Sequence, residues 1–442
     1  MSNLLLFSVF LLIPTFFLTY YTVETISPGS LVNYFKKNYN NVFLIILFVF
    51  CLFPFSFMTK TGAVSANYLF VLIPLTYILY TREILLPKID ITIYILFYFL
   101  LFLISSIMQF ENWALFSRRF ISFVIFLSIF LLAFIYIKKK IINYFLLSFL
   151  LLGIILASYS IWSYFYHQYN EIQLAAKGAM GTSRYGFSYL FNFWILIFYK
   201  FKTNNLKLFL FTKYSLLLLM VIGCFLTFSR SSTLCLYISF FMYFCVLTFK
   251  IVKNSSTKTI IKHFFLTIII TIFLFFLLYY FFYWSLFFSF DRLILNFFSK
   301  YGTDVFNLEN YNTSEGYRYH ILLIIIEFLK YNLITGSGFL GMWTYPDHFQ
   351  LYNFVDHFVG SAHSQYFDIL FRTSYLGLLL YLIMLFRLHT YFYKYNKGIF
   401  WGLLTVSIFG LFHETFKLSY GAFLLCILIN IYSNDIYGKE EN

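Results

Sequence analysis

Long apolar runs recur from one end of the chain to the other, and they limit its fold more than any other feature. We place them near residues 3–19, 42–58, 67–80, 90–108, 119–137, 142–161, 185–199, 210–228, 231–250, 263–284, 366–386, 399–415 and 419–433. An α-helix needs roughly 17–25 apolar residues to cross about 30 Å of hydrocarbon. Only 11% of the residues are charged, whereas a soluble domain carries about 25%. The sequence therefore predicts an all-α, polytopic membrane protein.

Basic residues gather in every second connection between the runs. They are Lys36 and Lys37, Arg82 and Lys88, Lys138 to Lys140, Lys200, Lys202 and Lys207, Lys250, Lys253, Lys258 and Lys262, and Arg387, Lys394 and Lys397. Cytoplasmic loops carry an excess of lysine and arginine, so we expect about 12 or 13 transmembrane helices with the C-terminus inside. The first run lacks the basic region and the cleavage site of a signal peptide, and we expect it to be retained. The count depends on whether this run spans the membrane.

The formal net charge of +14 raises the question of a polyanionic partner. The basic residues lie in short loops between apolar runs, where they set membrane topology, so we expect no nucleic-acid partner. The five cysteines all lie inside apolar runs, away from any zinc-like spacing. Neither a disulfide framework nor a metal cluster is therefore predicted, and the cysteines fit small packing residues.

One external connection, residues 285–362, is much longer than most connections between helices. It contains an amphipathic stretch, RYHILLIIIEFLKYN, that we expect to form an external helix or lid, followed by a glycine-rich turn, GSGFLG. Residues 1–284 are then the N-terminal transmembrane helices, 285–362 the periplasmic loop, and 363–442 the C-terminal transmembrane helices of one membrane domain.

Several charged residues lie at the predicted outer ends of spans. They are Arg118, Arg119, Arg184, Arg230, His363 and Glu414, with Arg318 in the external segment. External arginines run against the usual charge bias, and a charge at the membrane edge is costly enough to indicate function. The guanidinium group stays ionised and forms paired hydrogen bonds to phosphate oxygens. The pattern predicts an external site for a multiply charged anion.

Structural roles compete with this interpretation. Arg118 and Arg119 fit ordinary interfacial residues whose stems lie along apolar surface. Arg318 could form a loop salt bridge with Glu315. Arg372 and Asp368 lie one helical turn apart, and we expect them to pair with each other.

Three motifs follow one another around the long external segment: LTFSRSSTL, then YRYHILLIIIEFLKYNLITGSGF, then AHSQYFDILFRTSYLGLLLYL. The positions that carry the pattern are Arg230, Arg318, Gly336, Gly338, His363 and Gly377. This arrangement resembles the O-antigen polymerase and O-antigen ligase family of bacterial inner membranes, over roughly residues 42–433. An Arg-x10-Gly repeat described for some polymerases has no match after Arg318.

The resemblance implies a GT-C-like, all-helical glycosyltransferase of lipopolysaccharide biosynthesis in the inner membrane, with its active site facing the periplasm. Its donor would be an oligosaccharide on undecaprenyl diphosphate, and its other partners membrane lipids and a chain-length regulator protein. The resemblance also implies that no metal or other cofactor is needed. The carboxylates of the loop are compatible with this, because Asp304, Glu309 and Glu315 are scattered and do not form the cluster that holds a hard cation.

The reaction gives each candidate residue a role. The leaving diphosphate gains charge in the transition state, and we assign Arg230 and Arg318 to stabilise it, supported by Arg184. His363 is the candidate proton acceptor for the sugar hydroxyl, because its ordinary pKa is about 6.5; alternatively it only donates a hydrogen bond to diphosphate. Further residues expected to bind diphosphate or glycan are Arg119, Tyr317, Tyr366 and Glu414, although Glu414 could instead pair with Lys417.

Three functions fit these residues. A polymerase would transfer the glycan to a second lipid-linked repeat unit, which is the function we favour. A ligase would transfer it to lipid A-core or to a protein. A transporter is the alternative of a different class, but it would more often show paired repeats and charges near the bilayer midplane.

Overall fold

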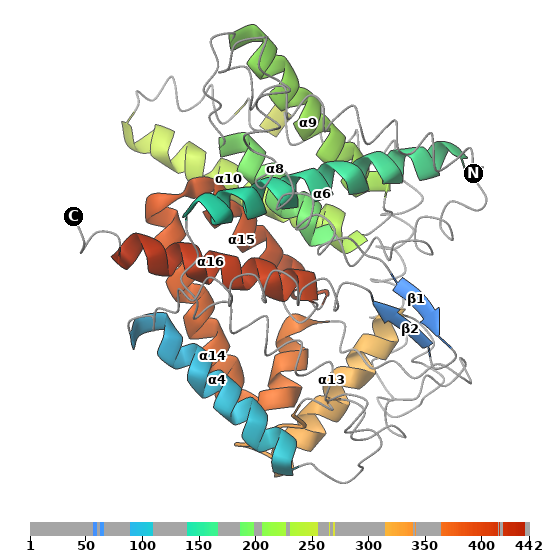
Figure 1. Ribbon diagram of the computed structural model, residues 1–442, viewed down its shortest axis with the longest axis vertical. Coiled ribbons are helices and arrows are strands. Elements are labelled where there is room, and N and C mark those ends of the chain that lie inside the picture. Colours follow the sequence, from blue (N-terminus) through green and yellow to red (C-terminus); the bar gives the residue numbers. More distant parts are fainter. Residues whose placement is uncertain are drawn as a thin grey trace, which may run out of the picture.

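The computed structural model describes the chain in separate segments. They cover residues 56–59, 62–65, 89–108, 139–166, 186–198, 206–226, 230–254, 265, 268–269, 314–338, 341, 364–413, 415 and 419–437. Helices dominate these segments, as Figure 1 shows. The helices are α4 (Ile89–Met108), α6 (Lys139–Tyr166), α8 (Gly186–Phe198), α9 (Leu206–Leu226), α10 (Arg230–Asn254), α13 (Ser314–Tyr331), α14 (Gln365–Tyr395), α15 (Lys397–Phe409) and α16 (Ser419–Tyr437).

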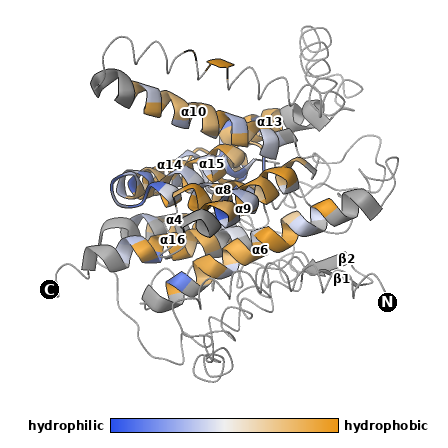
Figure 2. Ribbon diagram, turned by 90° about the horizontal axis from the view of Figure 1, so that it is seen from above, coloured by the Kyte–Doolittle hydropathy of each residue, from blue (hydrophilic) through white to orange (hydrophobic). Residues whose placement is uncertain are grey.

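Most predicted apolar runs that fall within the described segments are helical, as expected. Those that coincide with a helix are 90–108, 142–161, 185–199, 210–228, 231–250, 366–386 and 419–433. The runs near 3–19, 67–80 and 119–137, and nearly all of 263–284, lie outside the described residues. Within the described residues, two helical segments are long and apolar enough to cross a membrane, Ser231–Phe249 and Gln365–Tyr395. Figure 2 shows how apolar α6, α8 and α10 are along much of their length.

Two of the predicted runs need correction at their ends. Ser56–Thr59 and Gly62–Ser65 form the antiparallel strands β1 and β2, so residues 56–58, at the end of the run near 42–58, are extended and not helical. Serine, threonine, valine and glycine interrupt the apolar pattern there and favour a strand pair over a helix. The run near 399–415 is helical only as far as Phe409, because a turn begins at Gly410. The all-α prediction therefore holds for the described residues except for this hairpin.

The core of the molecule is built around α8, which packs along α15. Gly398, near the start of α15, lies against Phe198 at the end of α8, and Gly402 lies against Phe191. The indole rings of Trp194 and Trp401 stack between the two helices with 5.3 Å between centroids. Because glycines allow helix backbones to approach closely in a membrane, these contacts fix α8 and α15 as an antiparallel pair.

Helix α14 is broken at Ser374 and folds back on itself. The backbone angles of Ser374 are φ 60° and ψ −170°, outside the helical region. The rings of Tyr366 and Tyr381 lie only 6.2 Å apart, although a separation of 15 positions would span about 22 Å in a straight helix. Residues 366–386, predicted as one continuous span, therefore reverse direction at Ser374. This reversal places the start of α14 next to the core.

Helix α13 confirms the predicted amphipathic helix in the long connection. Its apolar stripe, Ile321, Ile325 and Leu329, is buried against Leu370 and Phe371 of the first part of α14. The aromatic rings of Phe328 and Phe371 are 4.9 Å apart. In Figure 1, α13 and α4 lie at the end of the molecule opposite α9. The external position predicted for residues 285–362 stays a prediction.

Candidate functional site

Two helix ends meet at His413. The Nε2 atom of His413, in the turn after α15, lies 2.7 Å from the hydroxyl oxygen of Ser231, the second residue of α10. The imidazole ring also packs on Phe409, with 4.8 Å between ring centroids. The end of α15 is thereby fixed to the start of α10.

The start of α14 reaches the same place. The backbone N–H of Gln365 donates a hydrogen bond of 2.7 Å to the carbonyl of Gly410, and the hydroxyl of Ser364 donates to the same carbonyl at 3.4 Å. Ser364 is also the N-cap of α14, since its side chain accepts from the N–H of Phe367. The hydroxyl of Tyr366 donates to the carbonyl of Ser407 at 2.8 Å.

The start of α8 closes the arrangement. Gly186, its first residue, lies so close to Ser232 that a Cβ atom there would collide with the serine hydroxyl, and it would come within 3.1 Å of the ring of Phe409. We call Gly186, Ser231, Ser364, Gly410 and His413 the helix-end junction. Three of the helices that meet in it, α8, α10 and α14, do so through their N-termini, whose partial positive charge favours anions.

Four of the predicted site residues lie within two positions of junction residues in the sequence. Arg230 is the first residue of α10, although its side chain is not described. Three others lie outside the described residues, but each is within two positions of a junction residue in the sequence. They are Arg184 before Gly186, His363 before Ser364, and Glu414 after His413. Arg119 lies outside the described residues without such a neighbour.

Tyr317 and Arg318 lie in the first turns of α13, where the description covers the backbone only. The end of α13 and the end of the first part of α14 meet at the break, because the hydroxyl of Ser374 donates to the carbonyls of Asn332 and Leu333. Since the two helices also pack side by side, they run in the same direction. The Arg318 end of α13 therefore lies on the same side as the Ser364 end of α14.

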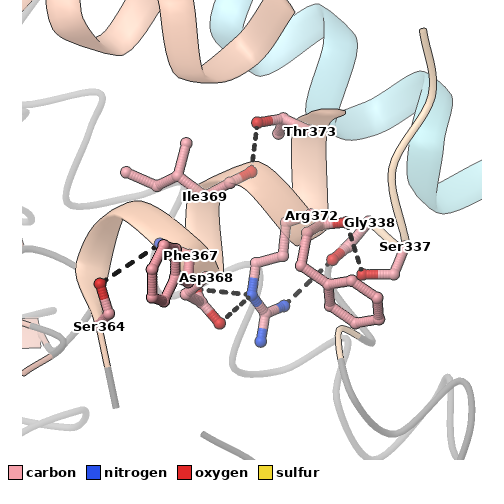
Figure 3. A network of polar contacts seen from close by, with 9 residues as sticks. Ser337, Gly338, Ser364, Phe367, Asp368, Ile369, Arg372 and Thr373 are labelled. Carbon is pink, nitrogen blue, oxygen red and sulfur yellow. Dashed lines mark hydrogen bonds and ion pairs between the residues drawn. The ribbon is translucent and has the colours of Figure 1, made fainter. Parts of the chain in front are cut away.

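A network of polar contacts holds the break in α14, as Figure 3 shows. The N–H groups of Ser337 and Gly338 donate to the carbonyls of Phe371 and Arg372 at 2.9 and 3.0 Å. In return, Nη1 of Arg372 donates to the carbonyl of Gly338 at 3.1 Å. Nε of Arg372 lies 2.9 and 2.8 Å from the two carboxylate oxygens of Asp368. We call these five residues the clamp.

The two glycines of the GSG turn leave no room for a side chain. A Cβ atom at Gly336 would collide with the backbone of Arg372, and one at Gly338 would collide with the backbone of Ser106 in α4. Gly338 also has a φ of 63°, which other residues rarely adopt. The N–H of Gly336 donates to the hydroxyl of Ser105 at 2.9 Å. The turn thus ties α13 to both α14 and α4.

The predicted pairing of Asp368 with Arg372 is confirmed, and the pair is buried, with side-chain exposures of 3% and 10%. A comparable pair on α13 is exposed: Nζ of Lys330 lies 2.6 Å from the carboxylate of Glu327, with exposures of 60% and 58%. The hydrogen bond to Glu327 raises the pKa of Lys330 above its ordinary value. The effect of breaking the buried pair can therefore be compared with the effect of breaking the exposed pair.

No group of three histidine, cysteine, aspartate or glutamate side chains within the described segments is arranged to share a metal ion. Among the described residues, the helix-end junction consists of three helix starts, the turn after α15 and His413. The metal-independent reaction stays a prediction.

The described residues form a mainly helical protein in which the starts of α8, α10 and α14 meet the end of α15. A family model described as O-antigen ligase matches residues 215–382. No curated protein is significantly similar to the chain in sequence. The match confirms the predicted family, so we assign this segment, from α9 to the second part of α14, to the O-antigen polymerase and ligase family. The apolar helices fit the membrane-integral proteins of that family.

His413 is not among the site residues predicted from the sequence, although the neighbouring Glu414 is. The signal was available, since FHETF places a second titratable residue at the end of an apolar run. His413 became notable only through its contact with Ser231, which is 182 positions away in the sequence.

The buried pair gives a direct test of the clamp. Asp368→Asn removes the carboxylate that faces Arg372, and breaking a buried ion pair costs about 3–5 kcal/mol. We expect the unfolding midpoint of the purified protein to fall by several degrees in a thermal scan. Glu327→Gln breaks the exposed pair on α13 and should leave the midpoint nearly unchanged. Equal effects of the two variants would contradict the clamp.

Proposed function

We propose that the protein is an O-antigen polymerase that transfers a glycan from undecaprenyl diphosphate to a sugar hydroxyl of a second lipid-linked repeat unit, on the periplasmic face. The proposal is supported chiefly by one observation: the starts of α8, α10 and α14, which lie at or within two positions of Arg184, Arg230 and His363 in the sequence, converge on the helix-end junction. The family match gives the general type of activity.

The leaving diphosphate determines what the site must provide. As the bond between the anomeric carbon and the diphosphate oxygen breaks, negative charge moves onto the diphosphate. Arg230 and Arg318 would stabilise this charge through paired hydrogen bonds, and Arg184 would support them. The N-termini of α8, α10 and α14 add partial positive charge of the same sign. Little water is expected at a site among membrane helices, which would strengthen each of these interactions.

The acceptor must lose a proton while its oxygen attacks the anomeric carbon. In this proposal His363 takes the proton from the sugar hydroxyl, and undecaprenyl diphosphate leaves with the electron pair of the broken bond. His363 would be presented by the residue that follows it, because Ser364 is fixed to Gly410 and caps α14. Glu414, next to His413, would orient one of the cationic groups, whereas Tyr317, Tyr366 and Arg119 would contact the glycan or diphosphate.

A ligase is the second candidate, because the matching family model is described as O-antigen ligase. It would use the same donor and transfer the glycan to lipid A-core. The donor-site residues serve both reactions equally, since both must hold the same diphosphate. The difference lies in the acceptor.

A deletion strain separates the two candidates. If the protein is a polymerase, its loss should leave single repeat units still attached to lipid A-core on a polysaccharide gel. Long chains that are not attached to the core would instead identify a ligase. Unchanged polysaccharide in the deletion strain would overturn both.

The roles of the arginines and His363 can be measured in the purified enzyme. His363→Ala should lower turnover by roughly 10²–10⁴-fold, the usual effect of losing a positioned base, with donor affinity changed much less. Arg318→Ala and Arg230→Ala should weaken the use of the donor, and lysine should restore it only in part. Lys330→Ala, on the same helix as Arg318 but with an exposed side chain, serves as the control. Full turnover in His363→Ala would remove His363 from the mechanism.

A further inference from the structure

The residues that follow α13 carry large apolar side chains on the surface. Tyr331, Leu333 and Ile334 have exposures of 81%, 63% and 68%. They belong to the long connection that the sequence predicts to be external. Apolar side chains gathered in this way are unusual on a surface that faces water and mark a contact with lipid or protein.

These side chains adjoin exposed apolar residues of two membrane helices. The carbonyl of Leu333 accepts a hydrogen bond from Ser374, and the next residues of α14, Tyr375 and Leu376, are 49% and 44% exposed. The same turn is bonded to Ser105 of α4, and Ile107, two positions further, is 65% exposed. Three elements that are tied together at one point therefore all present apolar side chains there.

The apolar surface continues along both membrane helices. On α4 the exposed residues include Phe97, Leu100, Leu103 and Ile104, and on α14 they include Leu379, Leu382 and Phe386. In a chain of this composition, such faces are the ones that contact lipid tails. The exposed side chains after α13 are thus an extension of a lipid-facing surface rather than an isolated patch.

Polar residues mark the other limit of the surface. Glu327 and Lys330 form their ion pair in the last turns of α13, just before Tyr331, and both side chains are exposed. Charged groups need water, whereas tyrosine is enriched where water meets the bilayer. After the charged pair the chain continues with Tyr331, Asn332, Leu333 and Ile334. The tyrosine and the two aliphatic residues thus follow the charged residues, as expected for a chain that enters a membrane interface from water.

We propose that residues 331–334 are inserted into the outer interface of the lipid bilayer and anchor the end of α13 there. The occupant of this surface is lipid, because the surface is continuous with the lipid-facing sides of α4 and α14. The long connection is then not wholly in water, and α13 is held at one end by the bilayer and by the GSG turn. This inference does not depend on the reaction that the protein catalyses.

Spin labels on the full-length protein in liposomes test the proposal. A single cysteine replaces Ile334 in one variant and Glu327 in the other, in a background in which the native cysteines have been replaced. Collisions of each label with oxygen, which concentrates in lipid, and with a nickel chelate, which stays in water, are then measured. The label at position 334 should show a several-fold higher ratio of oxygen to nickel collisions than the label at position 327.

Each other outcome overturns the proposal. Nickel collisions at position 334 as frequent as those at position 327 would place the turn in water. Few collisions with either reagent would mean that another protein, or a second copy of the chain, covers the surface. Leu333→Cys is the second label site if the first variant fails to fold, and it must give the same result.

Discussion

The break in α14 at Ser374 is the constraint on which the rest of the structure depends. A helix that ends inside a membrane protein leaves backbone carbonyls without their helical partners, and such groups must be satisfied within the protein. Here the N–H groups of Ser337 and Gly338 satisfy the carbonyls of Phe371 and Arg372. The guanidinium of Arg372 is satisfied in turn by Asp368 and by the carbonyl of Gly338. The clamp thereby makes an otherwise costly break stable.

The fold-back has a direct consequence for the candidate site. Because α14 reverses at Ser374, its first residues return to the end of α15, where Gln365 bonds to Gly410. There they meet the starts of α8 and α10, which Ser232, Ser231 and His413 hold in place. A straight α14 would carry Ser364 away from these helix ends. The proposed diphosphate site therefore rests on a structural feature well removed from it, the clamp at the break.

Much of the architecture could be predicted from the sequence, because apolar periodicity and length identify membrane helices well. The pairing of Asp368 with Arg372 was also predictable, since residues four positions apart share a helix face. The fold-back was not, because the predicted span 366–386 contains no proline and has no glycine at Ser374, where the helix breaks. Its cause lies in the GSG turn, some 35 residues earlier, and such a distant contact leaves no periodic signal. The same reason explains why His413 was missed.

The convergence of the helix ends is the central claim of this account, and a disulfide between α14 and the end of α15 tests it most directly. A Cβ atom placed at Gly410 would lie 3.4 Å from the Cβ of Gln365, close to the separation of about 3.5–4.5 Å found in disulfides. In a cysteine-free background, Gln365→Cys with Gly410→Cys should form an intramolecular disulfide on mild oxidation, detected by mass spectrometry of linked peptides. The control pair, Gln365→Cys with Gly398→Cys at the opposite end of α15, should not. Failure of the first pair to form a bond in folded protein, or equal bonding in both pairs, would contradict the account.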